Sequence, residues 1–235
     1  MIQKNIFQSW CTKVLPPPVQ ALVNSFKAAN PDYTYHLYDD ADMDRFVDEY
    51  FPGEIAQCYH RLNIIVAKVD FWRYLVLYQF GGVYLDMDSA ITGSLAGLIR
   101  DEDEAIITAE GNPNLYVQWA LIFSKGHPIL KKTIDFVVDN IKNNRFPNDL
   151  LRMTGPPVFT RGVNAIHQEL FDGHIIRHAD IRADTDVTYR NGDTSYRLFG
   201  VDFQGFFVFK HHLEHYLYSG KKHWRQESQE RPVLR

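Results

Sequence analysis

Apolar residues in the first half of the chain recur alternately at the spacing of strands and at the spacing of helices. Val19, Leu22, Val23 and Phe26 stand at the intervals of one helix face, directly after a proline-rich stretch. The alternating, β-prone run at residues 33–38 predicts a strand. The expected elements of this half are strands at residues 2–8, 33–38 and 82–86, and helices at residues 18–30, 40–50 and 62–79.

The second half of the chain is less regular. Its expected elements are strands at residues 105–109, 117–123 and 206–209, and helices at residues 128–140, 159–170 and 211–218. Residues 172–199 are polar and turn-rich, and no element is expected there. Strands that alternate with helices favour an α/β fold with a largely parallel central sheet flanked by helices. We expect one domain at residues 1–224 and a polar, mobile tail at residues 225–235.

Bulk properties exclude several classes of protein. A net charge of −4 and a pI near 6.2 give no general attraction to nucleic acid. Cys11 and Cys58 match no metal-binding or redox spacing. The sequence shows no signal peptide and no apolar run long enough to span a membrane, so we expect a soluble, cytoplasmic protein. Nothing in the sequence indicates the oligomeric state.

The most informative motif is the pair Asp86 and Asp88, which follows Gly81-Gly82 and a short apolar run. Side chains two residues apart on a strand leave on the same face. Two carboxylates on one face repel each other unless a cation lies between them, and a divalent metal carrying a diphosphate meets that need. A structural alternative remains open, because an Asp at the end of a strand can also cap the next turn.

The spacing of this motif is not specific in itself. The same Asp-x-Asp spacing occurs in polar or helix-start stretches, at Asp40/Asp42, Asp42/Asp44, Asp101/Asp103 and Asp184/Asp186. Those pairs are most simply solvated or capping carboxylates. The position after an apolar strand is therefore what distinguishes Asp86 and Asp88.

A second candidate feature is the pair Asp70 and Arg73, which share one face of the expected helix at residues 62–79. The alternative is an ordinary ion pair within the helix. The surrounding residues are apolar, however, and a buried Arg needs a carboxylate or phosphate partner. The functional interpretation is that Asp70 accepts hydrogen bonds from sugar or ribose hydroxyls and that Arg73 balances negative charge.

Aromatic and imidazole side chains complete the set of candidates. Trp10 follows the first strand and could stack on a nucleobase or belong to the core. His211, His212 and His215 match no zinc spacing, but one of them could complete an octahedral Mn²⁺ or Mg²⁺ site. Residues 154–156 form a rigid turn that could line an acceptor pocket or serve only as a loop.

Taken together, these segments resemble glycosyltransferase family 32, whose sugar-binding region contains a DXD motif. The resemblance is carried by residues 2–10, 30–33, 39–40 and 154–156, and above all by residues 67–88, which read AKVDFWRYLVLYQFGGVYLDMD. The family implies a GT-A fold and a metal-dependent, retaining glycosyltransferase that uses Mn²⁺ or Mg²⁺. It also implies a UDP- or GDP-sugar donor and a glycan, polysaccharide or glycoprotein acceptor.

The resemblance also implies roles for individual residues. Trp10 would stack on the base, Asp70 and Arg73 would hold the donor sugar and diphosphate, and Tyr84 would lie beside the donor. Asp86 would contact ribose or sugar and the metal, and Asp88 would bind the metal directly. Family members commonly end in a His-rich segment and a Ser-Trp pair. Here the Ser-Trp pair is interrupted within residues 219–224, so His211 is the expected third ligand.

Two other functions compete with this one. Residues 83–88 also resemble the first strand of phosphatases with a nucleophilic Asp, although Ala90 stands where those enzymes have Thr or Val. A non-catalytic nucleotide-sugar binder is the second rival. The intact set of Asp70, Arg73, Asp86 and Asp88 argues against a decayed enzyme. Among mechanisms of transfer we favour front-face attack, because no carboxylate stands out in the sequence as a covalent nucleophile.

Overall fold

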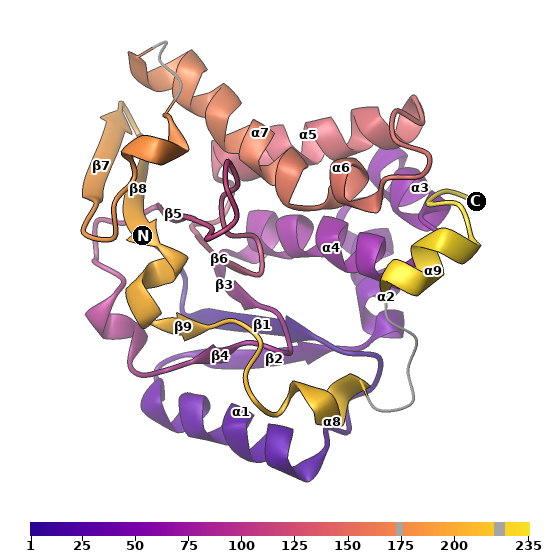
Figure 1. Ribbon diagram of the computed structural model, residues 1–235, viewed down its shortest axis with the longest axis horizontal. Coiled ribbons are helices and arrows are strands. Elements are labelled where there is room, and N and C mark those ends of the chain that lie inside the picture. Colours follow the sequence, from indigo (N-terminus) through magenta and orange to yellow (C-terminus); the bar gives the residue numbers. More distant parts are fainter. Residues whose placement is uncertain (173–175, 219–223) are drawn as a thin grey trace.

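The computed structural model describes residues 1–172, 176–218 and 224–235 and contains one large mixed sheet between two layers of helices (Figure 1). The strands are β1 Asn5–Ser9, β2 Thr34–Tyr38, β3 Gly82–Leu85, β4 Ala90–Ile91, β5 Ala105–Ala109, β6 Ala120–Phe123, β7 Asp186–Asn191, β8 Thr194–Val201 and β9 Phe207–Val208. The α/β class expected from the sequence is confirmed.

The strand order of the large sheet is β2-β1-β3-β6-β5-β8-β7, and β4 pairs with β9 in a separate small sheet. β1 is parallel to β2 and β3, and β5 is parallel to β8. β6 is antiparallel to both β3 and β5, so β3 and β5 run in the same direction. The carboxyl ends of β1, β3, β5 and β8 therefore share one edge, where open α/β sheets bind ligands.

Helices cover both faces of this sheet (Figure 1). The α-helices are α1 Pro17–Ala29, α2 Asp40–Tyr50, α3 Glu54–Arg61, α4 Ile65–Phe80, α5 Pro128–Lys142, α6 Leu150–Thr154, α7 Pro156–His167, α8 Glu214–Tyr218 and α9 Trp224–Glu230. α4, α5, α6 and α7 lie on one face, and α1 and α8 lie on the other. The expected helices of the first half are confirmed within a few residues, and Asp39 caps α2 through a capping box.

Alternation along the central strands divides the core in two. Phe7 and Tyr84 point into the layer of α4 and α5, whereas their neighbours Ile6 and Val83 point into the layer of α1. β3, β5 and β6 are buried along their whole length. Strands buried on both faces form continuous apolar runs, which is why these segments are recognisable in the sequence.

Three segments differ from the expectations. No element is expected at residues 172–199, but β7 and most of β8 lie there and form a hairpin. β7 is exposed at the sheet edge, so its sequence is polar. α3 was not expected. Residues 225–235 were expected to form a mobile polar tail, but α9 occupies much of this segment, and Val233 and Leu234 are buried because they are apolar. The backbone N–H of Asn63 donates to the carbonyl of Val233.

No helix in the described part of the chain is both long enough and apolar enough to cross a membrane.

Candidate functional site

A Gly-Gly turn brings β3 against β1 and so fixes where Asp86 emerges. Gly81 and Gly82 have φ of +66° and +124°, a region that other residues rarely adopt. A Cβ on Gly82 would lie 2.6 Å from the carbonyl oxygen of Asn5. The pair of glycines therefore allows both the turn after α4 and the close approach of the two backbones.

Asp86 leaves the end of β3 at the carboxyl edge of the sheet, as the sequence predicts. Its Oδ1 accepts a 2.6 Å hydrogen bond from the Tyr84 hydroxyl and lies 3.3 Å from a terminal nitrogen of Arg73. Its backbone is also fixed, because its N–H donates to Trp119 and its carbonyl accepts from the Gln8 side chain. The Asp86 side chain is 25% exposed. It is therefore bound on one side by Arg73 and Tyr84 and is accessible to solvent on the other.

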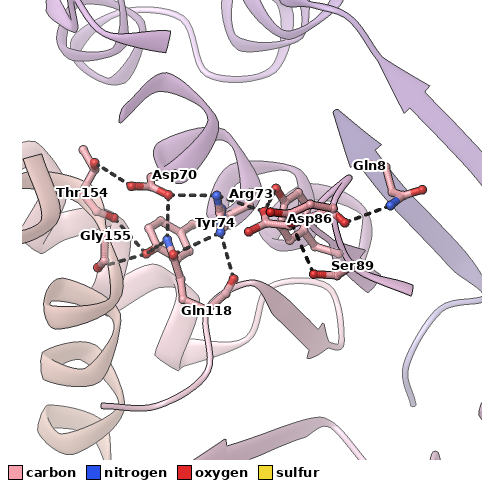
Figure 2. A network of polar contacts seen from close by, with 11 residues as sticks. Gln8, Asp70, Arg73, Tyr74, Asp86, Ser89, Gln118, Thr154 and Gly155 are labelled. Carbon is pink, nitrogen blue, oxygen red and sulfur yellow. Dashed lines mark hydrogen bonds and ion pairs between the residues drawn. The ribbon is translucent and has the colours of Figure 1, made fainter. Parts of the chain in front are cut away.

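Arg73 lies behind Asp86 and joins the acidic residues of the site (Figure 2). One terminal nitrogen lies 2.9 Å from Asp70 Oδ1 as well as near Asp86, and the other donates to the backbone and side-chain oxygens of Gln118 at 3.0 and 3.1 Å. The guanidinium lies over the Tyr84 ring, 4.7 Å from its centroid. Arg73 is therefore buried, as its apolar surroundings in the sequence indicate, and it contacts Asp70, Asp86 and Gln118 at once.

Asp70 is enclosed by protein groups. Its Oδ1 accepts from Arg73 and from the Gln118 amide, and its Oδ2 accepts from the Thr154 hydroxyl at 3.2 Å. The side chain is only 5% exposed. In this arrangement Asp70 orients Arg73, whereas the sequence-based interpretation has it contact donor hydroxyls. The three expected residues Asp70, Arg73 and Asp86 are brought together.

Gln118 and Tyr74 belong to this network, although the sequence pattern does not predict a role for either. The amide nitrogen of Gln118 also donates to the Tyr74 hydroxyl at 2.7 Å, and that hydroxyl donates to the carbonyl of Thr154 at 2.9 Å. Figure 2 shows Gln118 joined by dashed lines to both Asp70 and Arg73, with Thr154 and Gly155 on the side of Asp70 away from Arg73. A signal was present, because Gln118 is a lone amide in an apolar run at residues 115–123.

The ionisation of the site follows from its burial. Burial raises the pKa of Asp70 and Asp86, and the nearby charge of Arg73 acts in the opposite direction. Burial opposes the charge on Arg73, but Asp86 and its other acidic neighbours hold its pKa above the ordinary value. Burial also raises the pKa of Tyr84, so its hydroxyl remains protonated and donates to Asp86.

Asp88 and His211 lie side by side. The backbone N–H of His211 donates to the Asp88 carbonyl at 2.8 Å, and both residues are buried. Nδ1 of His211 accepts from the backbone of Leu213, so Nε2 carries the proton and donates to the carbonyl of Met87. Both ring nitrogens are thus occupied, and His211 fastens its segment to the Asp88 loop.

No group of three or more His, Cys, Asp or Glu side chains is placed to hold a metal ion within residues 1–172, 176–218 and 224–235. Asp86, Asp88 and His211, the ligands expected from the sequence, do not form such a group. His212 and His215, the alternative third ligands, are exposed. The interrupted Ser-Trp pair falls in residues 219–224, and residues 219–223 lie outside the described part of the chain.

Trp10 follows β1 at the same sheet edge as Asp86, where the sequence places it. Its backbone N–H donates to the carbonyl of Tyr38, and its partly buried ring packs against the core on the α1 side. The ring is therefore next to the edge at which a base would lie. Its stacking on a nucleotide remains a prediction.

A mixed sheet with helices on both faces and an Asp-x-Asp pair after a central parallel strand is the architecture of a GT-A glycosyltransferase fold. A solved structure named PaToxG Glycosyltransferase has this fold and is similar to the chain, with a TM-score of 0.59. The match has 24% sequence identity and covers 72% of this chain and 70% of that one. The GT-A fold expected from the sequence is confirmed.

Residues 16–108 match the family described as "glycosyltransferase sugar-binding region containing DXD motif". The matched region includes α4, β3 and both aspartates of the motif. This family is the one that the sequence resembles, and the match supports that resemblance.

Two curated relatives from yeasts are similar to the chain. The chain is 24% identical over 196 residues to an initiation-specific alpha-1,6-mannosyltransferase of Candida albicans, in a match covering 67% of this chain and 51% of the relative. It is 27% identical over 177 residues to inositol phosphoceramide mannosyltransferase 3 of Schizosaccharomyces pombe, covering 75% of this chain and 49% of the relative. The chain thus spans about half the length of these two relatives.

Proposed function

We propose that this protein is a metal-dependent, retaining glycosyltransferase that moves a hexose from a UDP- or GDP-sugar to a hydroxyl group of a glycan or another acceptor. The observation that carries the proposal is the position of Asp86, which is open to solvent in front and bound behind by Arg73 and Tyr84. Its location within the family-matched segment supports the same function.

The donor would lie across the edge formed by β1 and β3. Trp10 would stack on the base, and Asp86 would accept hydrogen bonds from ribose or sugar hydroxyls. Arg73 contributes positive charge behind Asp86. Asp70, being enclosed, would act by holding Arg73 in place, as second-shell partners do for catalytic groups.

The residues present fit a divalent metal in part. Asp86 and Asp88 offer carboxylate oxygens, which suit Mg²⁺ or Mn²⁺, and these ions commonly take further ligands from phosphate and water. His211 fits less well, because both of its ring nitrogens are hydrogen-bonded. When bound, the metal would neutralise the charge of the departing nucleoside diphosphate.

The transfer step we favour is a front-face substitution. The acceptor oxygen forms a bond to the anomeric carbon while the bond from that carbon to the diphosphate oxygen breaks. The proton of the acceptor hydroxyl passes to the departing phosphate oxygen, so the step needs no covalent enzyme intermediate. Asp86 would help to stabilise the positive charge that develops on the sugar ring, and trapping a glycosyl–Asp or glycosyl–Glu adduct would contradict this mechanism.

The rival functions are less well supported. In an Asp-nucleophile phosphatase the first carboxylate must attack phosphorus. Here Oδ1 of Asp86 is engaged by an arginine and a tyrosine hydroxyl, which lowers its nucleophilicity. A non-catalytic binder would show donor binding with no turnover under any acceptor, and release of phosphate from a generic phosphoester would favour the phosphatase.

The test is a thermal-shift screen of nucleotide sugars with Mn²⁺. A donor at one hundred times its Kd adds about 2.7 kcal/mol of stability. Because 1 kcal/mol raises Tm by about 2–4 °C in a chain of this size, the expected shift is about 5–10 °C. Asp88→Ala should abolish the metal-dependent part of this shift.

The matched control is Asp101→Ala, which alters an exposed aspartate of another Asp-x-Asp pair. We expect the donor-induced shift of this variant to equal that of the wild type. An unchanged shift in Asp88→Ala would contradict the proposed site, and no shift for the wild type with any donor would contradict the proposed function.

A further inference from the structure

A second group of acidic residues lies on the same sheet edge as Asp86. Glu110 directly follows β5, and Asp202 directly follows β8. Because β3, β5 and β8 are parallel, all three carboxylates emerge at the carboxyl edge. Only β6 separates β3 from β5, and strands are spaced by about 4.8 Å, so the ends of β3 and β5 are about 10 Å apart.

These two carboxylates line a cavity of about 310 Å³, whose wall also includes Trp119, Phe207 and Phe209. This volume is at the small end of the range for small-molecule sites, about 300–1,000 Å³. The cavity adjoins the candidate donor site through Trp119, whose carbonyl accepts the backbone N–H of Asp86 at 2.8 Å. A ligand here would therefore lie beside a sugar held by Asp86.

The polar groups of the cavity are rich in acceptors. Oε1 of Glu110 accepts from the Asn112 amide at 2.8 Å, whereas its Oε2 is buried with no hydrogen-bond partner among the described residues. Asp202 accepts from the backbone N–H of Gly111. Burial raises the pKa of both carboxyls, and the nearby charge of Asp202 raises that of Glu110 further. Both carboxyls line the same cavity. Such a pair selects a ligand that donates hydrogen bonds.

The remaining walls are aromatic. Phe209 is 45% exposed, which is unusual for so large an apolar ring, and it stacks on Trp119 with ring centroids 5.0 Å apart. Phe207 is buried and also lines the cavity. A flat apolar ring beside two hydrogen-bond acceptors suits a pyranose, which has hydroxyls around its rim and C–H bonds on its faces.

We propose that this cavity is the acceptor subsite, in which a neutral sugar ring packs on Phe209 and donates hydroxyl hydrogen bonds to Glu110 and Asp202. The proposal rests on the proposed function in one respect, namely that the neighbouring edge binds the donor. It deepens that function by naming a pyranose as the class of acceptor.

Direct binding tests the subsite without relying on transfer. Saturation-transfer NMR with α- and β-methyl glycosides of glucose, galactose and mannose is measured on the protein with Mn²⁺ and UDP or GDP. We expect at least one glycoside to bind the wild type. Glu110→Gln, Asp202→Asn and Phe209→Ala should each raise its Kd at least about 10-fold, which corresponds to the loss of one interaction of about 1.4 kcal/mol.

The variants are chosen to preserve the fold. Asp202 has φ of 46°, and Asn tolerates this left-handed conformation as well as Asp does. Glu110→Gln can keep the bond from Asn112, and Phe209 is too exposed for its loss to open a core cavity. The matched control is Asp193→Asn, an exposed residue in the turn at the opposite end of β8, which should leave the Kd unchanged.

Each outcome decides one of the two proposals. Glycoside binding that is absent from the wild type, or equal in all variants, overturns the subsite. The same holds if Glu110→Gln abolishes binding of Mn²⁺ alone, because the cavity is then a cation site. If glycosides bind and the variants lose them while no nucleotide sugar shifts the Tm of the wild type, the subsite stands and the proposed donor function fails.

Discussion

Two buried arginines of this protein have similar surroundings, but within the ranges that the structure describes only one of them has a hydrogen-bond acceptor for every nitrogen. Arg73 lies between Asp70 and Asp86, and Arg197 on β8 lies between Asp103 and Asp186. Each guanidinium also lies over an aromatic ring, at 4.7 Å and 4.8 Å from the centroid. By composition alone the two clusters are equivalent.

The two clusters differ in how many of the guanidinium nitrogens have a hydrogen-bond acceptor. Every nitrogen of Arg197 has an acceptor, including two nitrogens on Asp103 and one on the carbonyl of Leu98. Arg73 keeps a buried Nε with no partner in the described part of the chain, and its carboxylate Asp86 is open to solvent. A closed ion pair fixes structure, whereas an incomplete one at a sheet edge retains capacity for a ligand.

The largest effect should come from removing each arginine in turn. In Arg197→Met the buried Asp103 loses its partner, so the free energy of unfolding should fall by about 3–5 kcal/mol. Arg73→Met should lose less stability, because Asp86 can reach water and the enclosed Asp70 keeps its hydrogen bonds from Gln118 and Thr154. Its rate of sugar transfer should fall by about 10²–10³-fold. Urea unfolding and initial rates on folded protein measure the two quantities.

The comparison breaks if the two variants behave alike. Equal loss of transfer per folded molecule would mean that Arg197 also serves the reaction. Equal loss of stability, with transfer intact in Arg73→Met, would mean that both clusters are structural.

Acidification should lower the free energy of unfolding by a smaller amount, through a histidine that contacts β8, the strand of Arg197. His127 donates to the carbonyl of Ser195 on β8, and burial lowers its pKa to about 4. Above pH of about 6.5 the histidine is neutral in both states, but below it the unfolded chain gains a proton that the folded one refuses. Stability should therefore fall by about 3 kcal/mol between pH 6.5 and pH 4, at about 1.4 kcal/mol per pH unit.

His127→Asn supplies the control for this pH dependence. Asn is a good N-cap, so it can replace the imidazole that caps α5 without introducing a titrating group. Urea unfolding across this pH range should show a shallower loss in the variant. Identical slopes would assign the acid sensitivity to other groups.

The smallest effect should come from Gln118, which joins Asp70 to Arg73. Gln118→Met removes the amide bonds but keeps the backbone carbonyl that Arg73 also uses. A loss of about 1.4 kcal/mol from the transition state would lower kcat about 10-fold. If Gln118 only positions the network, the donor KM should stay near the wild-type value.

An exposed glutamine provides the reference. Gln57→Met on α3 should leave kcat and KM unchanged. A rise in donor KM with constant kcat in Gln118→Met would show that this residue contributes to ground-state binding, and not to the orientation of Arg73.

The sequence predicts the Arg73 side of this comparison better than the Arg197 side. Asp70 and Arg73 are three residues apart on a helix, and Asp86 directly ends a buried strand, so local geometry brings them together. Gln118 joins them only because β6 enters the sheet antiparallel to β3, a pairing that the sequence pattern does not specify.

Arg197 and Asp103 are far apart in the sequence, and their contact depends on the pairing of β5 with β8. The β7–β8 hairpin was not expected because β7 is an exposed, polar edge strand with weak periodicity. A usable signal was the Asn191-Gly192 turn, a dipeptide that favours tight hairpins. Asp103 does belong to an Asp-x-Asp pair, but its polar surroundings in the sequence indicate only a solvated or capping carboxylate.

Gln118 and Trp119 are consecutive residues, yet the first belongs to the Arg73 network and the second to the wall of the neighbouring cavity. The backbone is fixed at this point, because the Gln118 carbonyl accepts a hydrogen bond from Arg73 and the Trp119 carbonyl accepts one from the N–H of Asp86. Inserting or deleting a single residue before β6 would exchange their positions and misplace both at once. Lineages that diversify their acceptor would therefore be expected to vary the aromatic surface elsewhere, and to keep the length of this connection constant.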